Sequence, residues 1–154
     1  MVIIFFCSGS DEKAMELFSL TAANIPEDVV LRRYVSAEHL KGVLLDTKIR
    51  EAFIIIPAFH EETLIDAYFI NNLLCRHNSM VILPDRGKLS AALGHVLRPV
   101  RTFYGDSDLN DIISVIREFT GCQSAKKPNK QVIAMKTFFD VPHNNGMEKK
   151  VSNL

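Results

Sequence analysis

The sequence has no run of 18 or more apolar residues and no net charge, and each absence excludes a class of protein. Without such a run, no segment has the character of a membrane-spanning helix. Lysine plus arginine number 18, as do aspartate plus glutamate, so the total charge gives no reason to expect nucleic acid or a membrane as a partner. The initial methionine leads straight into an apolar run, so we also expect no signal peptide.

The sequence has few cysteines, and they form no recognisable motif. Cys7, Cys75 and Cys122 lie far apart, without a CxxC pair and without the even number that a disulfide framework needs. This usage favours a reducing compartment, and we expect the protein to be cytoplasmic.

The common motifs for nucleotides, metals and cofactors are also missing. Neither GxxxxGK[ST] nor GxGxxG occurs, and the five histidines form no HExxH pair. We therefore expect no metal, no cofactor and no catalytic residue that can be identified from a motif.

What is present is a regular alternation of short apolar runs with helical patterns. Strands are expected at Val2–Phe6 and at residues 29–35, 52–56, 80–84 and 96–104. Helices are expected at residues 11–25, after Ser36, at 61–75, after Asp85 as far as Gly94, and at 107–120. This order predicts a three-layer α/β/α sandwich, with a five-stranded parallel sheet in the flavodoxin-like order 2-1-3-4-5.

The composition changes after Gly121, so we divide the chain into an α/β domain (1–121) and a tail (122–154). The domain holds 12 basic and 16 acidic residues, a net of −4, and the tail holds 6 and 2, a net of +4. The tail begins with a basic linker. Residues 131–141 could form an extra strand or a short amphipathic helix, and residues 142–154 are expected to be disordered.

Ligands of open α/β sheets bind at the carboxyl ends of the strands. Here this rule selects the loop Cys7, Ser8, Gly9 and Ser10, together with Asp85 and Arg98, as candidate ligand-binding residues. Each also has a structural interpretation. Cys7 could be a small buried side chain, Ser8 or Ser10 the N-cap of the first helix, Asp85 the cap of a later one, and Arg98 a solvated strand end.

The stretch FFCSGS resembles the phosphocysteine loop of sugar-phosphotransferase IIB proteins, in which a strand ends in cysteine and a small-residue loop leads into a helix. That resemblance implies a nucleophilic Cys7. Asp11 and Glu12 depart from it, because two carboxylates would repel a bound phosphate.

The order of elements over residues 1–121 resembles the receiver domain of two-component response regulators. In that family, acids after the first strand hold Mg²⁺, an aspartate after the third accepts phosphate, and a Lys-Pro pair belongs to the fifth. Here Cys7 and Ser8 stand in the place of the acids, and Pro57 (or Ile56) stands in the place of the aspartate. Pro84 stands where the fourth strand of the family has Thr or Ser, and Arg98-Pro99 matches the Lys-Pro pair. The resemblance therefore implies a receiver-like module that lacks the phosphorylation residues.

Two functions remain open. The first is a non-enzymatic, phosphorylation-independent signalling or regulatory module that contacts a partner protein or a second copy of itself as a homodimer. The second is a small enzyme, or a protein that binds a mononucleotide or phosphate at residues 7–10.

Overall fold

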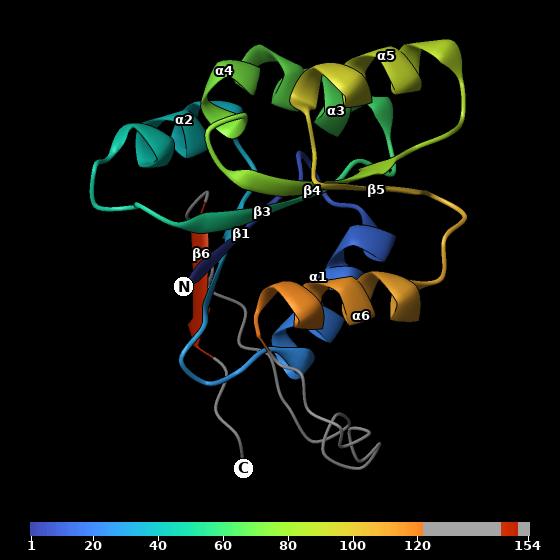
Figure 1. The fold of residues 1–154 in the computed structure, drawn as a ribbon. Coiled ribbons are helices and arrows are strands. Elements are labelled where there is room, and N and C mark those ends of the chain that lie inside the picture. Colours follow the sequence, from blue (N-terminus) through green and yellow to red (C-terminus); the bar gives the residue numbers. More distant parts are fainter. Residues whose placement is uncertain (122–145, 151–154) are drawn as a thin grey trace.

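The computed structural model describes residues 1–121 in full and the backbone of residues 146–150 (Figure 1). None of the helices in this described part is long and apolar enough to cross a membrane. The element predicted within residues 131–141 lies outside the described residues.

Six strands form one sheet in the order β5-β4-β3-β1-β2-β6. Their bounds are β1 Val2–Phe6, β2 Val30–Tyr34, β3 Ala52–Pro57, β4 Asn78–Leu83, β5 Arg101–Tyr104 and β6 Gly146–Lys150. The first five pair in parallel. The predicted flavodoxin-like order 2-1-3-4-5 is thereby confirmed, and β6 adds an antiparallel strand at the β2 edge.

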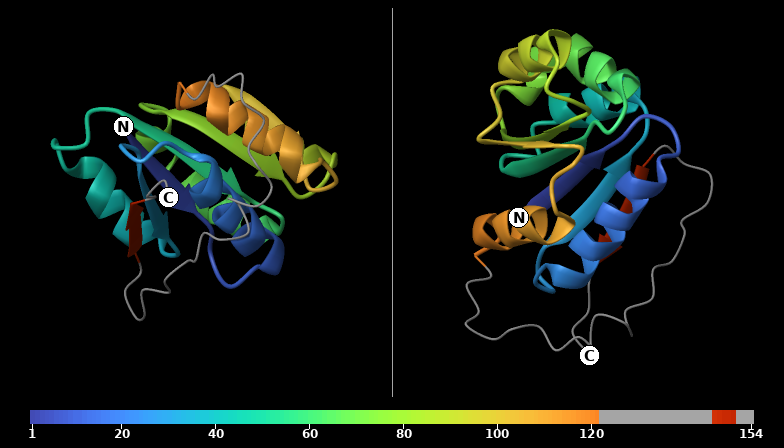
Figure 2. Two further views of the ribbon diagram at one scale, coloured as in Figure 1. Left: turned by 90° about the horizontal axis from the view of Figure 1, so that it is seen from below. Right: turned by 90° about the vertical axis from the view of Figure 1, so that its right-hand side faces the viewer.

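Helices cover both faces of the sheet, as Figure 2 shows in two further views. One face carries α1 (Glu12–Asn24) and α6 (Leu109–Phe119), and the other carries α2 (Ala37–Leu45), α3 (Glu61–Phe69), α4 (Asn71–Leu74) and α5 (Lys88–Leu97).

The alternation of side chains along β1 explains why its sequence is apolar throughout. Ile3 and Phe5 pack in the core under α1 and α6, whereas Ile4 and Phe6 pack in the core under α2 to α5. A parallel strand buried on both faces needs an unbroken apolar run.

The helix expected at residues 61–75 is in fact two helices, α3 and α4, separated at Ile70. The Asn71 side-chain amide donates to the Tyr68 carbonyl at 2.6 Å. A continuous helix would use that carbonyl for the backbone of residue 72, so the asparagine competes with the helix and ends it. The bend leaves Ile70, Leu73 and Leu74 buried in the core.

Helix α5 also differs from its prediction at both ends. Its N-cap is Gly87, without a side-chain cap, and the Asp85 carboxylate instead accepts from the Gly87 backbone at 2.7 Å. Gly94 does not end the helix, which runs on to Leu97 and is capped by Arg98 with φ 48°. Gly94 serves packing, since a Cβ there would lie 3.0 Å from both terminal methyl groups of Leu83.

Two helix caps and the tail also differ from their predictions. Asp11 caps α1, where we expected Ser8 or Ser10, and Asp108 caps α6, which begins at Leu109 and not at residue 107 as expected. The tail supplies a strand, but at Gly146–Lys150. We expected disorder over residues 142–154, so that expectation is wrong for these five residues. Their composition gave little strand signal, because glycine, lysine and glutamate are depleted in strands.

Candidate functional site

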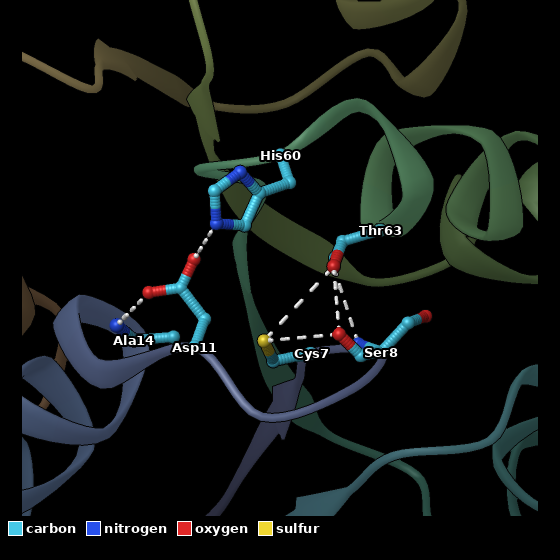
Figure 3. Close-up of polar contacts among 6 residues, drawn as sticks. All are labelled: Cys7, Ser8, Asp11, Ala14, His60 and Thr63. Carbon is cyan, nitrogen blue, oxygen red and sulfur yellow. Dashed lines mark hydrogen bonds and ion pairs between the residues drawn. The ribbon is translucent and has the colours of Figure 1, made fainter.

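The carboxyl ends of β1 and β3 lie side by side, and their loops form the candidate site (Figure 3). One loop carries Cys7 to Asp11 from β1 into α1. The other carries Ala58 to His60 from β3 into α3. The contacts within and between these loops decide which polar groups remain for a ligand.

Cys7 is a core side chain. It is 2% exposed and packs with the apolar residues under α1 and α6. Its sulfur lies 3.9 Å from the Thr63 hydroxyl. Burial, the largest cause, raises the pKa of the thiol above its ordinary 9.0, and the Asp11 carboxylate also raises it, although the bond to Thr63 lowers it. A protonated, buried thiol is a poor nucleophile, so the geometry favours the structural interpretation of Cys7.

Ser8 is bonded to two side chains of helix α3, those of Thr63 and Asp66. Its backbone N–H donates to the Thr63 hydroxyl at 3.2 Å, and that hydroxyl can donate back to the Ser8 carbonyl at 3.4 Å. Its own hydroxyl donates to the Asp66 carboxylate at 2.5 Å. A phosphate-binding loop presents free N–H and hydroxyl donors, and here Ser8 uses both of its donors within the protein.

Gly9 and Ser10 form the exposed tip of the loop. Gly9 has φ +78°, a conformation that glycine adopts without steric cost. It therefore lets the chain turn from the strand into the helix.

Asp11 uses both of its carboxylate oxygens. One accepts from the Ala14 backbone at 3.0 Å and so caps α1, and the other lies 2.8 Å from Nε2 of His60. The Asp11 side chain is 10% exposed and that of His60 is 76% exposed. This pair thus joins the two loops at the surface above Cys7 (Figure 3).

Lys13 connects the same region to the end of β5. Its ammonium donates to the Gly105 carbonyl and lies 4.9 Å from the centroid of the Phe59 ring. On the far side of β5, Arg86 stacks on Tyr104 at 3.9 Å and approaches Asp106 at 3.4 Å. Lys13 and Arg86 therefore both contact protein groups.

Asp85 and Arg98 are not brought together with the Cys7 loop. Asp85 follows β4 at the carboxyl edge, but it is exposed and bonds to its own turn. Arg98 precedes β5, so it lies at the amino end of that strand, on the opposite edge of the sheet. The expectation that Arg98 joins this crevice is wrong, because the strand begins only at Arg101, after Pro99.

Sequence reasoning missed Thr63 and Asp66, which hold the loop. The available signal was weak: a threonine and an aspartate three residues apart on a helix lie on one face. Nothing in the pattern indicates that this face points at the loop after β1. Within the part that the structure describes, no group of three or more His, Cys, Asp or Glu residues could hold a metal ion.

A groove of about 950 Å³ lies elsewhere, beside α2. Its charged lining is balanced between three cationic and three acidic side chains, namely Arg32, Lys48, Arg50, Glu38, Asp46 and Glu51. The balance favours no class of ligand.

The assignment of Cys7 leads to a prediction about thiol reactivity. In a Cys122→Ser variant of the full chain, we expect a thiol reagent at pH 8 to label the exposed Cys75 and to leave Cys7 unlabelled until denaturant is added. Mass mapping of the labelled peptides measures this. Rapid labelling of Cys7 below pH 8 in the folded protein would support a nucleophilic cysteine instead.

Comparison with known proteins places the fold. No protein-family model matches the sequence, and no curated protein does. A response regulator from Colwellia psychrerythraea aligns with a TM-score of 0.53 at 13% identity, over 79% of this chain and 98% of its own. A CheY-like response regulator receiver domain protein from Methanospirillum hungatei JF-1 aligns with a TM-score of 0.49 at 12% identity, over 79% of this chain and 95% of its own. The described chain thus has the flavodoxin-like α/β fold seen in the Colwellia response regulator.

Proposed function

We propose that the protein is a receiver-like signalling or regulatory module that works in the cytoplasm, by protein contact and without being phosphorylated. One observation carries the proposal. Strand β3 ends at Pro57, followed by Ala58, and both are buried. The receiver family has its phosphate-accepting aspartate at this strand end, and neither residue here has a carboxylate that could form an acyl phosphate.

The neighbouring strand ends support the same proposal. Cys7 and Ser8 stand where the family has Mg²⁺-binding acids, and the first carboxylate after them, Asp11, is used by the cap of α1 and by His60. The Arg98-Pro99 pair, which we matched to the Lys-Pro of the fifth strand, lies at the wrong end of β5, and Gly105 follows the strand instead. Pro84 follows β4.

The exposed apolar side chains indicate where the contact would form. Most of the large exposed ones lie on α3 and α5, two neighbouring helices of the same face. They are Ile65, Tyr68 and Phe69 on α3, and Leu89 and Val96 on α5. We call these five residues the α3–α5 patch. Exposed apolar patches mark protein contact sites.

We assign a second copy of the chain to this patch. An isologous dimer needs only one patch, which meets itself across a two-fold axis. Phe69, at 74% exposed, is the most exposed large apolar residue of the patch. Aromatic residues in such positions are the common anchors of interfaces.

The test is the self-association of the full chain, measured by sedimentation equilibrium. Phe69→Glu is expected to weaken the dimer at least about tenfold, because the interface would then bury an unpaired charge. Leu45→Glu is the matched control, since Leu45 is 58% exposed on α2, outside the patch. A wild-type chain that stays monomeric, or an equal effect of both substitutions, would contradict the assignment.

A further inference from the structure

The outer edge of β2 carries a strand from the far end of the chain. Strand β6 pairs with it antiparallel over five positions, from Val30 opposite Lys150 to Tyr34 opposite Gly146 (Figure 1). The receiver-like order needs only β1 to β5, so β6 is an addition at this edge. An unpaired strand edge is a template for another extended chain.

The sequence of β6 makes it a weak occupant of this edge. It reads GMEKK, and glycine, lysine and glutamate are all depleted in strands. It also brings two lysines and one glutamate to an edge that already carries Arg32 and Arg33. Glu148 lies directly opposite Arg32 and complements its charge, whereas Arg33 has Met147 opposite it and gains no such complement.

The Arg33 side chain has a hydrogen-bond donor that a different strand at this edge could satisfy. Its Nε is buried and has no hydrogen-bond partner among the residues that the structure describes. A buried donor without a partner destabilises the folded state, and does so more strongly when it is charged. Arg33 alternates with Tyr34 and shares the sheet face of Leu31, under α1. The register sets Met147 directly opposite it.

A carboxylate at the position of residue 147 could accept this hydrogen bond. Residues directly opposite in an antiparallel pair lie about 4.5–5.5 Å apart and share a face of the sheet. A glutamate is long enough to reach the guanidinium across that distance, and arginine–carboxylate bonds are among the stronger hydrogen bonds in proteins. Methionine offers no such acceptor.

We propose that the β2 edge is a docking site for an extended, antiparallel segment of a partner protein with Asp or Glu opposite Arg33, and that β6 occupies it in cis as a displaceable substitute. The surface differs from the α3–α5 patch, so the two proposals can fail separately. Self-association tests the patch, whereas hydrogen exchange of β2 and β6 and the binding of a β6 peptide test the β2 edge alone.

The first experiment strengthens the occupant in the full chain. Met147→Glu is expected to slow hydrogen exchange of the β2 and β6 amides at least about tenfold, the equivalent of one charge-assisted hydrogen bond. In an Arg33→Ala background the same substitution should have no effect. Met147→Gln is the matched control of similar size without the charge, and a smaller gain is expected. Equal protection in both backgrounds would overturn the proposal.

The second experiment offers the occupant in trans. The probe is a labelled peptide of residues 144–152 carrying Met147→Glu, compared with the unchanged peptide. The receptor is the full chain with Met147→Pro and Glu148→Pro. Successive N–H groups alternate between the two sides of a strand, so this pair removes one that faces β2 in either case.

Fluorescence anisotropy then measures binding. The Glu peptide should bind the proline variant at least about tenfold more tightly than it binds the wild type, and more tightly than the unchanged peptide does. Adding Arg33→Ala should abolish its advantage. Equal binding of the two peptides, or an advantage that survives Arg33→Ala, would overturn the proposal. Should the proline variant not fold, the exchange experiment still decides.

Discussion

Replacing Thr63 by valine is expected to lower the free energy of unfolding by about 2 kcal/mol, the cost of leaving a buried hydrogen-bonding group without its partner. Valine keeps the shape of threonine and loses only the hydroxyl. That hydroxyl accepts from the Ser8 N–H at 3.2 Å and lies 3.9 Å from the Cys7 sulfur. Thr63 is 2% exposed, so water does not replace the lost group readily.

Urea denaturation measures this loss, and an unchanged m-value would show that the native fold is retained. In a chain of this size the melting temperature should fall by roughly 4–8 °C. Thr63→Ser is the control, because it keeps the hydroxyl and removes only a methyl group; it should cost clearly less. If valine were as stable as threonine, the bond from α3 would not be what holds the loop after β1.

The same loop shows how much of the candidate site could be predicted from the sequence. The apolar run Val2–Phe6 followed by Cys7 and a glycine predicts a buried strand and a turn, and both are present. The helix residue that contacts the loop could not be predicted. Thr63 lies 55 residues further along, and one sequence gives no register between a loop and the face of a helix. The local part of the site was thus predictable, and its long-range contacts were not.

Where the helix predictions failed, side-chain contacts had overridden local signals. Gly94 resembles a helix stop in the sequence, yet it lies within α5, where its missing Cβ makes room for Leu83. Asn71 breaks a pattern whose apolar spacing is otherwise continuous. The apolar spacing predicted that a helix begins at residue 61, but its length depended on a single amide.

Arg98 illustrates the cost of a misplaced strand boundary. Its placement beside Cys7 required the fifth strand to end near Arg98, whereas β5 covers Arg101–Tyr104 and begins after it. Because opposite ends of a strand lie at opposite edges of the sheet, an error of a few residues moved the arginine to the wrong side of the molecule. The order of the strands was unaffected, since it depends on the alternation of elements.

We also expect that this chain is not phosphorylated by a small phosphodonor. With acetyl phosphate and Mg²⁺, a receiver with its full set of acids forms an acyl phosphate. This chain is expected to form no detectable amount, because Pro57 and Ala58 provide no carboxylate at the end of β3. The nearby carboxylate of Asp66 is bonded to Ser8 and that of Asp11 caps α1. Neither is free to act as the acceptor.

The most direct test of this account is therefore the intact mass of the full chain after incubation with acetyl phosphate and Mg²⁺, with a receiver domain that carries the full set of acids as the positive control. The account predicts an unchanged mass for this chain and an added phosphoryl group on the control. A phosphoryl group on this chain that is lost in base or with hydroxylamine would contradict phosphorylation independence, and its position would identify the acceptor.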